Sequence, residues 1–230
     1  MLAYIQKYIN MLSENGKKYL ISFISDKESW INAFILKIKN ELEKDGHAVN
    51  IAHYIADITP GDFNFILSFS NIIPENILSL NKHNLVVHES ALPTGRGWSP
   101  LTWQILEGKN EIPITLFEAK KSVDSGEIYF QAMMRFVGDE LVDDLRYVQG
   151  QTTISLCKRF IQEYPDIIKL AQIQVGASTF FRKRTSEDSK LDPNKTIADQ
   201  FNLLRIVDNT RYPAFFEFMG NRYELHIKKL

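Results

Sequence analysis

Short apolar runs that alternate with segments of helical periodicity are the feature that most restricts the fold of this chain. Runs of strand length fall at 17–25, 47–54, 63–70, 84–90 and 114–118, and 120–130 is a turn that leads into another strand. Apolar residues recur at helical spacing over 29–42, 74–80, 99–107, 137–163, 165–174 and 196–206. Strands separated by helices favour a parallel sheet with crossover connections. The sequence therefore predicts an α/β fold, an open and mostly parallel sheet with flanking helices.

The two ends of the chain depart from this alternation. Residues 1–13 carry apolar side chains at helical spacing, which predicts an amphipathic N-terminal helix. The stretch 176–195 is polar and irregular, and the chain after it predicts a helix and then two strands joined around Gly220-Asn221. We therefore expect a catalytic domain over 1–175 that includes the N-terminal helix, and a small helix-and-hairpin region over 176–230.

Charge, cysteine content and hydropathy narrow the class of protein. The net charge of −1 gives no general basic field for nucleic acid or an anionic membrane. The one cysteine, Cys157, lies in an apolar helical stretch, where a buried thiol is the expected state. It cannot form an internal disulfide, which fits a reducing compartment. Neither a signal peptide nor a run long enough to span a membrane is evident. We expect a cytoplasmic protein without nucleic-acid or membrane partners.

A glycine- and proline-rich loop over 91–100 follows the predicted strand that ends near His88. Ligands of open parallel sheets bind beyond the carboxyl ends of the strands. Gly95 and Gly97 allow the backbone to approach a ligand closely, and Arg96 between them is a candidate ligand contact. Asp124 opens a turn after a later strand. If the two strand ends are adjacent, His88 and Asp124 form a base with an orienting carboxylate; a structural histidine and an ordinary turn are the alternatives.

Residues 88–131 resemble the core of the folate-dependent formyltransferases. That family's pattern is a histidine, then Ser-x-Leu-Pro, Arg-Gly-x-x-Pro and Asp-x-Gly-x-Ile. Its elements are matched, at the family's spacing, by His88; by Ser90, Leu92 and Pro93; by Arg96, Gly97 and Pro100; and by Asp124, Gly126 and Ile128. The stretch 61–78 is similar to the family's strand and pteridine loop, and 201–229 is similar to the ending of nucleotide-sugar N-formyltransferases. The resemblance covers about 17–229 and implies a Rossmann-like formyltransferase fold.

The resemblance implies N10-formyltetrahydrofolate as the formyl donor, with no metal. His88 would take the amine proton or stabilise the oxyanion, and Asp124 would orient His88 or an ordered water. The implied folate-binding residues are Phe69, Ser70, Ile72, Ile73, Pro74, Arg96, Gly97, Glu118 and Val123. The implied acceptor-binding residues are Ser90, Pro93, Gly95 and Trp98. The histidines, at 47, 53, 83, 88 and 226, have no ligand-like spacing for a metal.

One position departs from the family pattern. The family's asparagine two residues before the histidine, which is implied to hold the formyl oxygen, is Val86 here. Losing such a donor costs about 2.7–4 kcal/mol if nothing replaces it. Ser90, Asn71, a backbone N–H or a protonated His88 are the candidate replacements. Without one, the chain would be a noncatalytic relative that binds folate or a nucleotide sugar.

The C-terminal segment and the amino-acid sequence of residues 88–108 indicate one class of acceptor substrate. Both are similar to enzymes that formylate a nucleotide-linked 4-amino-4,6-dideoxy sugar. Residues 88–108 in particular resemble the pseudaminic-acid type, which would act on UDP-4-amino-4,6-dideoxy-L-AltNAc. Methionyl-tRNA formyltransferases share the core but carry a larger C-terminal domain and a basic surface, which we do not expect here. Another small amine acceptor and a formyl-folate hydrolase are the alternatives.

Two further surfaces have alternative interpretations. The Arg-Lys-Arg run at 182–184 is either a solvated face or a contact for a diphosphate. The aromatic C-terminal segment and the apolar N-terminal segment predict a homodimer, because large apolar surfaces are rarely left exposed.

Overall fold

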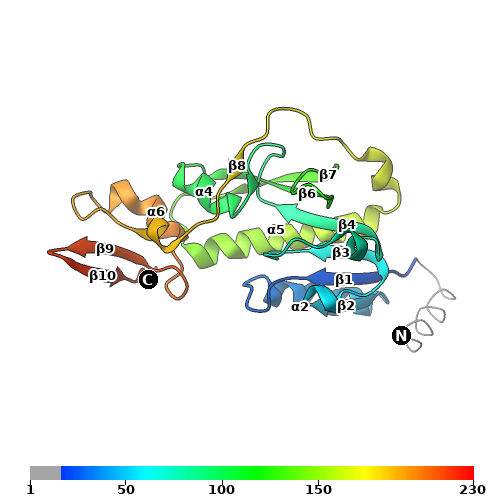
Figure 1. The fold of residues 1–230 in the computed structure, drawn as a ribbon. Helices are drawn as coiled ribbons and strands as arrows, with labels where there is room; N and C mark the ends of the chain where they lie inside the picture. Colours follow the sequence, from blue (N-terminus) through cyan, green and yellow to red (C-terminus); the bar gives the residue numbers. More distant parts are fainter. Residues whose placement is uncertain (1–16) are drawn as a thin grey trace. The chain divides into compact units, whose positions relative to one another are not determined.

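The computed structural model describes residues 17–230 (Figure 1), and the helix predicted over 1–13 lies outside these described residues. The described chain folds as two compact units. The first unit holds the chain up to Val87 together with Leu116–Phe130 and Thr153–Ile173, and the second holds His88–Thr115, Gln131–Thr152 and Gln174–Leu230. The domain boundary that the sequence suggests at residue 175 stays a prediction.

Six strands of the described chain form one sheet in the order β2-β1-β3-β4-β6-β7. Their bounds are β1 (Leu20–Ile24), β2 (Ala48–Ala52), β3 (Gly61–Ile66), β4 (Asn81–His88), β6 (Glu111–Glu118) and β7 (Ile128–Arg135). Strand β1 pairs in parallel with β2 and with β3, and β3 pairs in parallel with β4. The predicted open and mostly parallel sheet is therefore confirmed.

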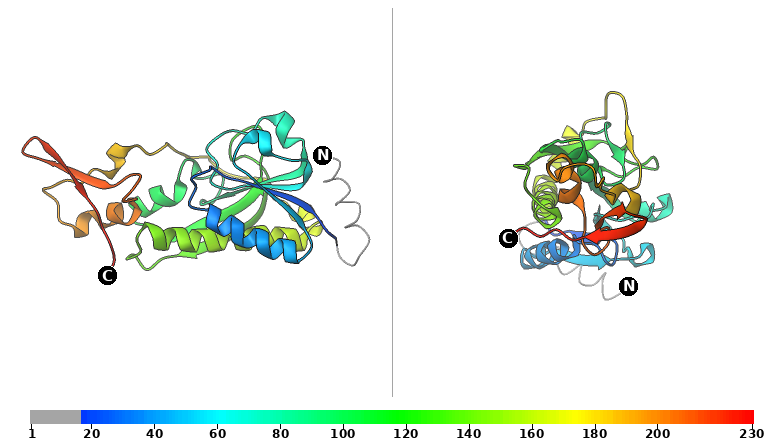
Figure 2. Two further views of the ribbon diagram at one scale, coloured as in Figure 1. Left: turned by 90° about the horizontal axis from the view of Figure 1, so that it is seen from below. Right: turned by 90° about the vertical axis from the view of Figure 1, so that its left-hand side faces the viewer.

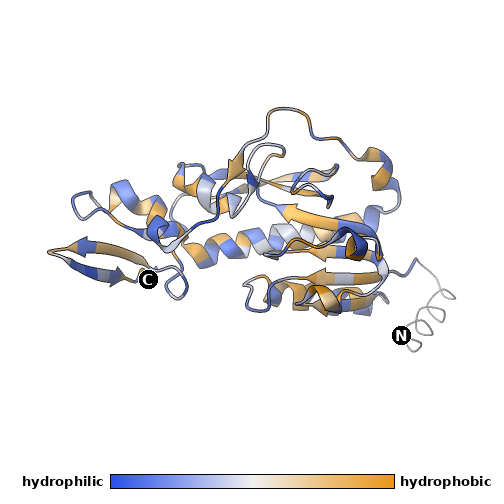
Figure 3. Ribbon diagram, in the orientation of Figure 1, coloured by the Kyte–Doolittle hydropathy of each residue, from blue (hydrophilic) through white to orange (hydrophobic). Residues whose placement is uncertain are grey.

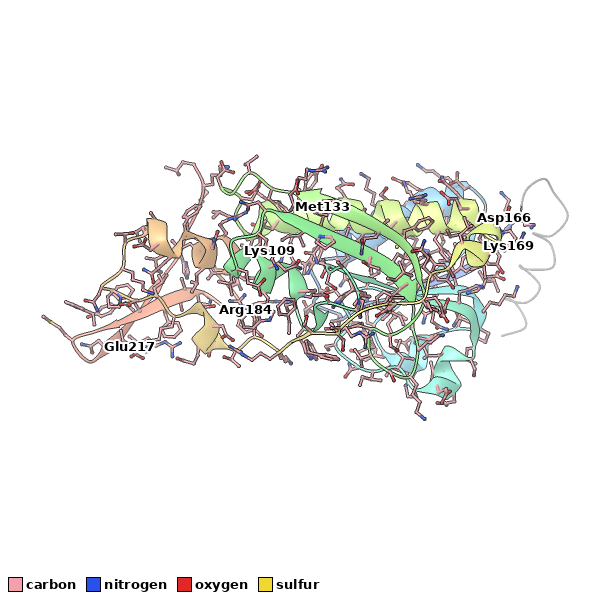
Figure 4. The ribbon with its side chains drawn as sticks, turned by 90° about the horizontal axis from the view of Figure 1, so that it is seen from above. Lys109, Met133, Asp166, Lys169, Arg184 and Glu217 are labelled. Atoms are coloured by element: carbon pink, nitrogen blue, oxygen red, sulfur yellow. The ribbon has the colours of Figure 1, made fainter. Side chains whose placement is uncertain are left out.

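Helices occur at the predicted places, with shifted ends. The α-helices are α2 (Asn32–Lys44), α3 (Glu75–Leu78), α4 (Pro100–Leu106), α5 (Val142–Glu163) and α6 (Phe201–Ile206). The 3-10 turns are η1 (Ile55–Asp57), η2 (Asp166–Leu170), η3 (Ser186–Ser189) and η4 (Ala198–Gln200). On η2, Asp166 and Lys169 point toward each other and form an exposed ion pair of 2.8 Å (Figure 4). Within residues 17–230, none of the helices has both the length and the hydropathy of a membrane span.

The helix predicted from residue 137 begins only at Val142, for two local reasons. Gly138 has φ +104°, which a right-handed helix cannot contain. The carboxylate of Glu140 also accepts hydrogen bonds from the backbone N–H groups of Val137, at 2.6 Å, and Gly138, at 2.9 Å. A carboxylate that satisfies free N–H groups in this way stabilises the turn before the helix.

The core of the first unit is built from aromatic side chains of the central strands and of α5. Phe63 and Phe65 on β3 are fully buried, and the ring of Phe160 on α5 lies edge-on to Phe63 at 5.4 Å. Strand β1 is coloured as mostly hydrophobic in Figure 3, as expected for a strand with neighbours on both edges. Each fully buried side chain of this size contributes about 1.5–3 kcal/mol.

Helix α2 and the C-terminal half of α5 lie side by side in this unit (Figure 2, left). An ion pair between Glu41 and Lys158 joins them. Next to Lys158, Cys157 is fully buried, and burial raises the pKa of its thiol far above the usual range. The prediction of a buried thiol at Cys157 is confirmed.

The second unit contains the predicted C-terminal hairpin. Strands β9 (Ala214–Phe218) and β10 (Asn221–Leu225) pair antiparallel and are joined by Met219 and Gly220, which have φ +50° and +77°. Positive φ at both turn residues matches the twist of a two-residue hairpin. A small apolar cluster at the base of the hairpin joins it to α6 and is formed by Leu191, Leu204, Val207 and Ala214.

A buried cation stabilises the same unit. Arg205 on α6 is only 1% exposed. Its guanidinium donates to Glu140 Oε2 at 3.0 Å, to Asn110 Oδ1 at 2.8 Å and to Asn202 Oδ1 at 3.1 Å. Because the charge is paired and hydrogen-bonded, its burial is tolerated, whereas removal of one partner would leave an uncompensated charge.

Candidate active site

His88 is the last residue of β4 and belongs to the second unit. Its side chain is 7% exposed, and its Nε2 lies 2.8 Å from the carbonyl oxygen of Gly95. A carbonyl oxygen only accepts hydrogen bonds, so Nε2 carries a hydrogen. In the neutral imidazole the basic nitrogen is then Nδ1. The contact with Gly95 therefore fixes the orientation of the imidazole ring at the start of the loop.

The loop after β4 is held by a segment more than eighty residues further along the chain. The two-residue strand β5 (Arg96–Gly97) pairs in parallel with β8 (Phe180–Phe181). Gly97 has φ +97°, and a Cβ added to it would lie 2.4 Å from the carbonyl oxygen of Phe181. Only glycine fits this close approach. Sequence reasoning missed β8, because a two-residue strand in a polar stretch carries no periodic signal.

Ser90 presents an unusual buried hydroxyl in this unit. Its Oγ has no hydrogen-bond partner among the residues that the structure describes. The backbone of Ser90 is fixed, since its carbonyl accepts from Thr115 Oγ1 at 2.6 Å and its N–H donates to the His88 carbonyl at 2.9 Å. Buried polar groups nearly always have a partner in native proteins. The hydroxyl is therefore suited to a ligand, which is the role that the sequence predicts for it and which stays a prediction.

Arg96 and Pro93 complete the loop on which the family pattern depends. The Arg96 guanidinium donates from Nη2 to Gln174 Oε1 at 2.6 Å, and its buried Nε has no partner among residues 17–230. Pro93 is buried, so its contribution here is packing rather than an exposed surface. The predicted folate contact of Arg96 and the predicted acceptor contact of Pro93 stay predictions.

Two tryptophans lie beside the same loop. Trp98 is 40% exposed, and the Lys183 ammonium lies over its ring at 4.7 Å from the centroid. Trp103 stacks on Phe181 and donates from its indole N–H to the Arg182 carbonyl at 2.9 Å. Trp103 therefore packs the loop against the β8 segment. Trp98 presents an exposed aromatic face, in keeping with its predicted role toward the acceptor, which stays a prediction.

The arginines of the basic run at 182–184 are engaged within the protein. Arg182 forms a bidentate pair with Asp188, and this pairing holds the pKa of the Asp188 carboxyl well below its usual range. Arg184, labelled in Figure 4, is partly buried, and its burial lowers the pKa of its guanidinium. Both arginines therefore already have contacts within the protein. The predicted contact of this run with a diphosphate stays a prediction.

Asp124 belongs to the first unit and sits in a tight turn after β6. It has φ +52°, a conformation uncommon outside glycine. The backbone of Gly126 packs so closely on the Glu118 carbonyl that an added Cβ would lie 1.7 Å from that oxygen. The geometry of the turn is therefore tightly fixed. The prediction that Asp124 orients His88 stays a prediction.

The side chain of Glu118 forms a buried polar network at the base of this turn. Its Oε1 accepts from the Asn84 N–H at 2.6 Å, and its Oε2 accepts from the Tyr129 hydroxyl at 2.7 Å and lies 3.0 Å from His83 Nδ1. Burial, with the nearby Glu118 charge, raises the pKa of Tyr129 far above its usual range. Both carboxylate oxygens therefore have protein partners, and a contact of Glu118 with folate stays a prediction.

The segment predicted to wrap the pteridine divides into core and surface. Ile73 is buried in a cluster with Ile24, Ala52 and Ile58, and Phe69 packs against that cluster. In contrast, Ile72 is 74% exposed. Pro74 and Val123 are also exposed. Exposed apolar side chains of this kind are available to a ligand, whereas Ile73 acts through packing.

Asp26, which follows β1, was missed by sequence reasoning. Its Oδ1 accepts hydrogen bonds from both the N–H and the hydroxyl of Ser70, each at 3.1 Å, and its own N–H donates to the Ser68 carbonyl at 3.3 Å. Asp26 therefore fixes the start of the predicted pteridine loop. No sequence motif marks this pair, which joins residues 44 positions apart.

In residues 17–230 no group of histidine, cysteine, aspartate and glutamate side chains is arranged to hold a metal ion.

The fold is that of known formyltransferases. The structure aligns with methionyl-tRNA formyltransferase from Clostridium thermocellum with a TM-score of 0.74 and 22% identity, covering 89% of this chain and 91% of that one. It aligns with a 4-N formyltransferase from Francisella tularensis with a TM-score of 0.65 and 16% identity, covering 94% of this chain and all of that one, at 100%.

The sequence comparisons lead to the same class. Over 178 residues the chain is 28% identical to methionyl-tRNA formyltransferase of Mycoplasma capricolum subsp. capricolum, which covers 76% of this chain and 56% of that protein. The chain thus spans about half the length of the curated relatives it matches. A family model described as formyl transferase matches residues 31–149, just over half of the chain. The chain belongs to the formyl transferase family, and the predicted resemblance is confirmed. The formyl donor used in this family is N10-formyltetrahydrofolate.

Proposed function

We propose that this protein transfers the formyl group of N10-formyltetrahydrofolate to the amino group of a nucleotide-linked 4-amino-4,6-dideoxy sugar. Formyl transfer is supported by one observation above all: in a chain of this family, the imidazole of His88 is held by a hydrogen bond in a fixed position. Its Nε2 donates to the Gly95 carbonyl, which fixes the imidazole beside the loop that carries the family pattern. A base of this kind is what attack by a neutral amine requires.

The residues present fit a formyl donor. The buried Ser90 hydroxyl and the buried Arg96 Nε lack partners among the described residues, and both can donate to a carbonyl oxygen or to another acceptor of the ligand. When bound, the folate supplies an activated formyl carbon. Donors aimed at the formyl oxygen would compensate for the absence of an amide at Val86.

In this mechanism the protein manages protons and charge. The acceptor nitrogen bonds to the formyl carbon while the carbonyl electron pair moves to the oxygen, which Ser90 stabilises. His88 removes the proton from the new ammonium. The bond from the formyl carbon to the folate nitrogen then breaks, and that nitrogen receives the proton. Asp124 stabilises the charged imidazolium in this proposal, either directly or through water.

Three features support a sugar acceptor. The C-terminal hairpin predicted from the resemblance to sugar formyltransferases is present as β9 and β10. The fold also matches a 4-N formyltransferase over nearly the whole of both chains. The exposed face of Trp98 beside Lys183 offers an aromatic surface and a positive charge to a nucleotide. Within this class we propose UDP-4-amino-4,6-dideoxy-L-AltNAc, of the pseudaminic-acid type.

Methionyl-tRNA is the second candidate acceptor, and one observation favours it: the curated relatives are methionyl-tRNA formyltransferases at 28% identity. Simple hydrolysis of the formyl folate is a further outcome of the same test, and another small amine is the alternative if no member of the panel is formylated. The proposed homodimer is separate from the chemistry, and light scattering of the purified protein tests it.

The test incubates the protein with N10-formyltetrahydrofolate and, in separate reactions, UDP- and dTDP-linked 4-amino-4,6-dideoxy sugars and methionyl-tRNA. Mass spectrometry of the sugars and of the aminoacyl group identifies the product. The proposal expects a formylated sugar that is absent with His88→Asn. Formyl-methionyl-tRNA as the only product would replace the sugar with tRNA, and formate alone would indicate a hydrolase.

A further inference from the structure

A short chain of hydrogen bonds ends at the backbone of Ser90. The carbonyl oxygen of Ser90 lies 2.6 Å from the hydroxyl Oγ1 of Thr115 on β6, and the same Oγ1 lies 3.1 Å from Nε2 of Gln131 on β7. Thr115 is fully buried, so these two contacts take the place of water at its hydroxyl. All three residues belong to the second unit. The chain of bonds therefore joins strand β7 to the loop that follows His88.

The chemistry of the three groups decides the direction of each hydrogen bond. A carbonyl oxygen only accepts, so the single hydroxyl hydrogen of Thr115 is directed at the Ser90 carbonyl. Oγ1 then offers only lone pairs to Gln131, and the group of Gln131 beside it must be the amide NH2, which donates. Gln131 thus leaves the Thr115 hydrogen free for Ser90. Bonds in such a chain polarise and strengthen one another.

The backbone of Ser90 is held on both sides of its α-carbon. Its N–H donates to the His88 carbonyl at 2.9 Å, which fixes the preceding peptide group, and the bond from Thr115 fixes the following one. Because each peptide group is planar, the direction of the bond from Cα to Cβ is then fixed, and the hydroxyl can change only by rotation about χ1. That hydroxyl is buried and has no partner among the described residues. Of the two bonds to the backbone, only the one from Thr115 runs through a side chain, so a substitution can remove it.

We propose that Thr115 is a positioning residue that holds the backbone of Ser90 so that the Ser90 hydroxyl can donate to the formyl oxygen. The inference rests on the proposed function, in which Ser90 stabilises the charge that develops on that oxygen. A donor that is already in place stabilises such a charge without reorganisation during the reaction. Neither Thr115 nor its partner Gln131 is among the site residues that the sequence predicts.

Four variants separate the hydrogen bonds from the packing of the side chains. Thr115→Val keeps the shape of the side chain but cannot donate to Ser90, whereas Thr115→Ser keeps the hydroxyl. Gln131→Leu removes the donor to Oγ1 and leaves the bond to Ser90 in place. Gln131→Glu places a carboxylate beside Oγ1, and this stronger acceptor draws the Thr115 hydrogen away from Ser90. Thr210→Val, at an exposed threonine in the same unit, is the matched control.

The first readout does not depend on turnover. Serine is followed by alanine only once in the sequence, at Ser90-Ala91, so carbon-13 in the serine carbonyl and nitrogen-15 in alanine give a single correlation signal. The carbonyl carbon moves upfield when its oxygen loses a hydrogen bond. We expect this movement in Thr115→Val and Gln131→Glu, and the wild-type position in Thr115→Ser, Gln131→Leu and Thr210→Val. An unmoved signal in either of the first two variants would overturn the inference. If Thr115→Val does not fold, Gln131→Glu, at an exposed position, decides the outcome.

The second readout asks whether the effect passes through the Ser90 hydroxyl. We expect Thr115→Val to lower kcat about tenfold, with KM values changed by less than about twofold, and Thr115→Ser to retain the wild-type kcat. In a protein that already carries Ser90→Ala, Thr115→Val should change kcat by less than about twofold, because no hydroxyl is left to position. A loss of the same size with and without Ser90→Ala would show that Thr115 acts on the structure in general and would contradict the proposal.

Failure of the proposed function would give a different result. The wild type would then formylate no acceptor of the panel, and the carbonyl signal would still decide whether Thr115 holds the backbone of Ser90. If only the role of Thr115 is wrong, the wild type transfers the formyl group, while the carbonyl signal stays unmoved or the kcat losses are equal in the two backgrounds.

Discussion

The hydroxyl of Tyr129 donates a hydrogen bond of 2.7 Å to Oε2 of Glu118, joining the neighbouring strands β7 and β6. Glu118 precedes the turn that contains Asp124, and its Oε1 also accepts from the Asn84 N–H on β4. One carboxylate thus ties three strands together at the point where a proposed catalytic loop begins. This arrangement makes the stability of the sheet and the position of Asp124 depend on the same side chain.

Tyr129→Phe is expected to destabilise the protein by about 2 kcal/mol, because a hydrogen bond to a carboxylate contributes about 1.5–3 kcal/mol. Urea unfolding followed by circular dichroism at neutral pH measures the change. Tyr54→Phe, at an exposed tyrosine, is the matched control and should change stability by less than about 0.5 kcal/mol. Equal effects of the two substitutions would contradict the importance of the Glu118 contact.

The same tyrosine predicts a loss of stability at alkaline pH. Burial, then Glu118, raise the pKa of Tyr129 above the ordinary value of 10.0. Above that value the unfolded chain loses the proton while the folded chain keeps it, so the unfolded state binds fewer protons and stability falls as pH rises. Below about pH 10 the contribution is fully present. The fall between about pH 9 and pH 11 should be shallower in Tyr129→Phe, and an unchanged slope would show that Tyr129 does not cause it.

Gly97→Ala tests the close approach of the catalytic loop to the β8 segment. Alanine at a positive φ costs about 1–2 kcal/mol wherever it occurs. Gly220→Ala, with φ +77° and nothing within 4 Å of an added Cβ, should show this cost alone. At Gly97 the added Cβ would lie 2.4 Å from the Phe181 carbonyl, so a further loss of about 1–3 kcal/mol is expected. Thermal unfolding of both variants gives the comparison, and similar midpoints would exclude the contact as a constraint.

Ser90→Ala separates function from stability. The buried Ser90 hydroxyl has no partner among the described residues, so its removal should leave the free energy of unfolding unchanged or raise it. If the hydroxyl stabilises the developing oxyanion, kcat should fall about 100-fold. Single-turnover kinetics and urea unfolding on the same preparation measure both. A kcat close to that of the wild type would indicate that Asn71 or a backbone N–H, rather than Ser90, donates the hydrogen bond to the formyl oxygen.

Cys157 is expected to be unreactive in the folded protein. It is fully buried, and burial raises the pKa of its thiol, so almost no thiolate is present at neutral pH. Titration with a thiol reagent should label it only after a denaturant is added. Rapid labelling of the native protein would show that α5 opens readily at this position.

Much of the fold follows from the sequence because its signals are local. Apolar runs such as 17–25 and 63–70 correspond to β1 and β3, and the pattern over 29–42 corresponds to α2. The hairpin was predicted around Gly220-Asn221, and the turn itself is formed by Met219 and Gly220. Such features depend on neighbours in the chain, which a single sequence displays.

The unpredicted features arise from contacts between distant residues. The pairing of Gly97 with Phe181, the bond from Gly95 to Thr179 and the bonds from Ser70 to Asp26 join polar positions without periodicity. His88, Arg96 and Asp124 were candidates from the sequence itself, and most other site residues came from the family resemblance. Neither source identifies the residues that hold the loop in place. The orientation of the His88 ring likewise depends on a carbonyl direction that a sequence does not encode locally.

The most direct test of the central claim follows a carbon-13 label in the formyl group of N10-formyltetrahydrofolate during a single turnover with the nucleotide-sugar panel. We expect the label on the sugar nitrogen in equal amount to the tetrahydrofolate released. His88→Asn and Asp124→Asn should slow transfer by at least about 100-fold while the affinity for the folate is retained. Label that stays on the folate in the wild type, with every sugar and with methionyl-tRNA, or transfer that is unchanged in His88→Asn, would contradict the assignment of this protein as a formyltransferase that uses His88.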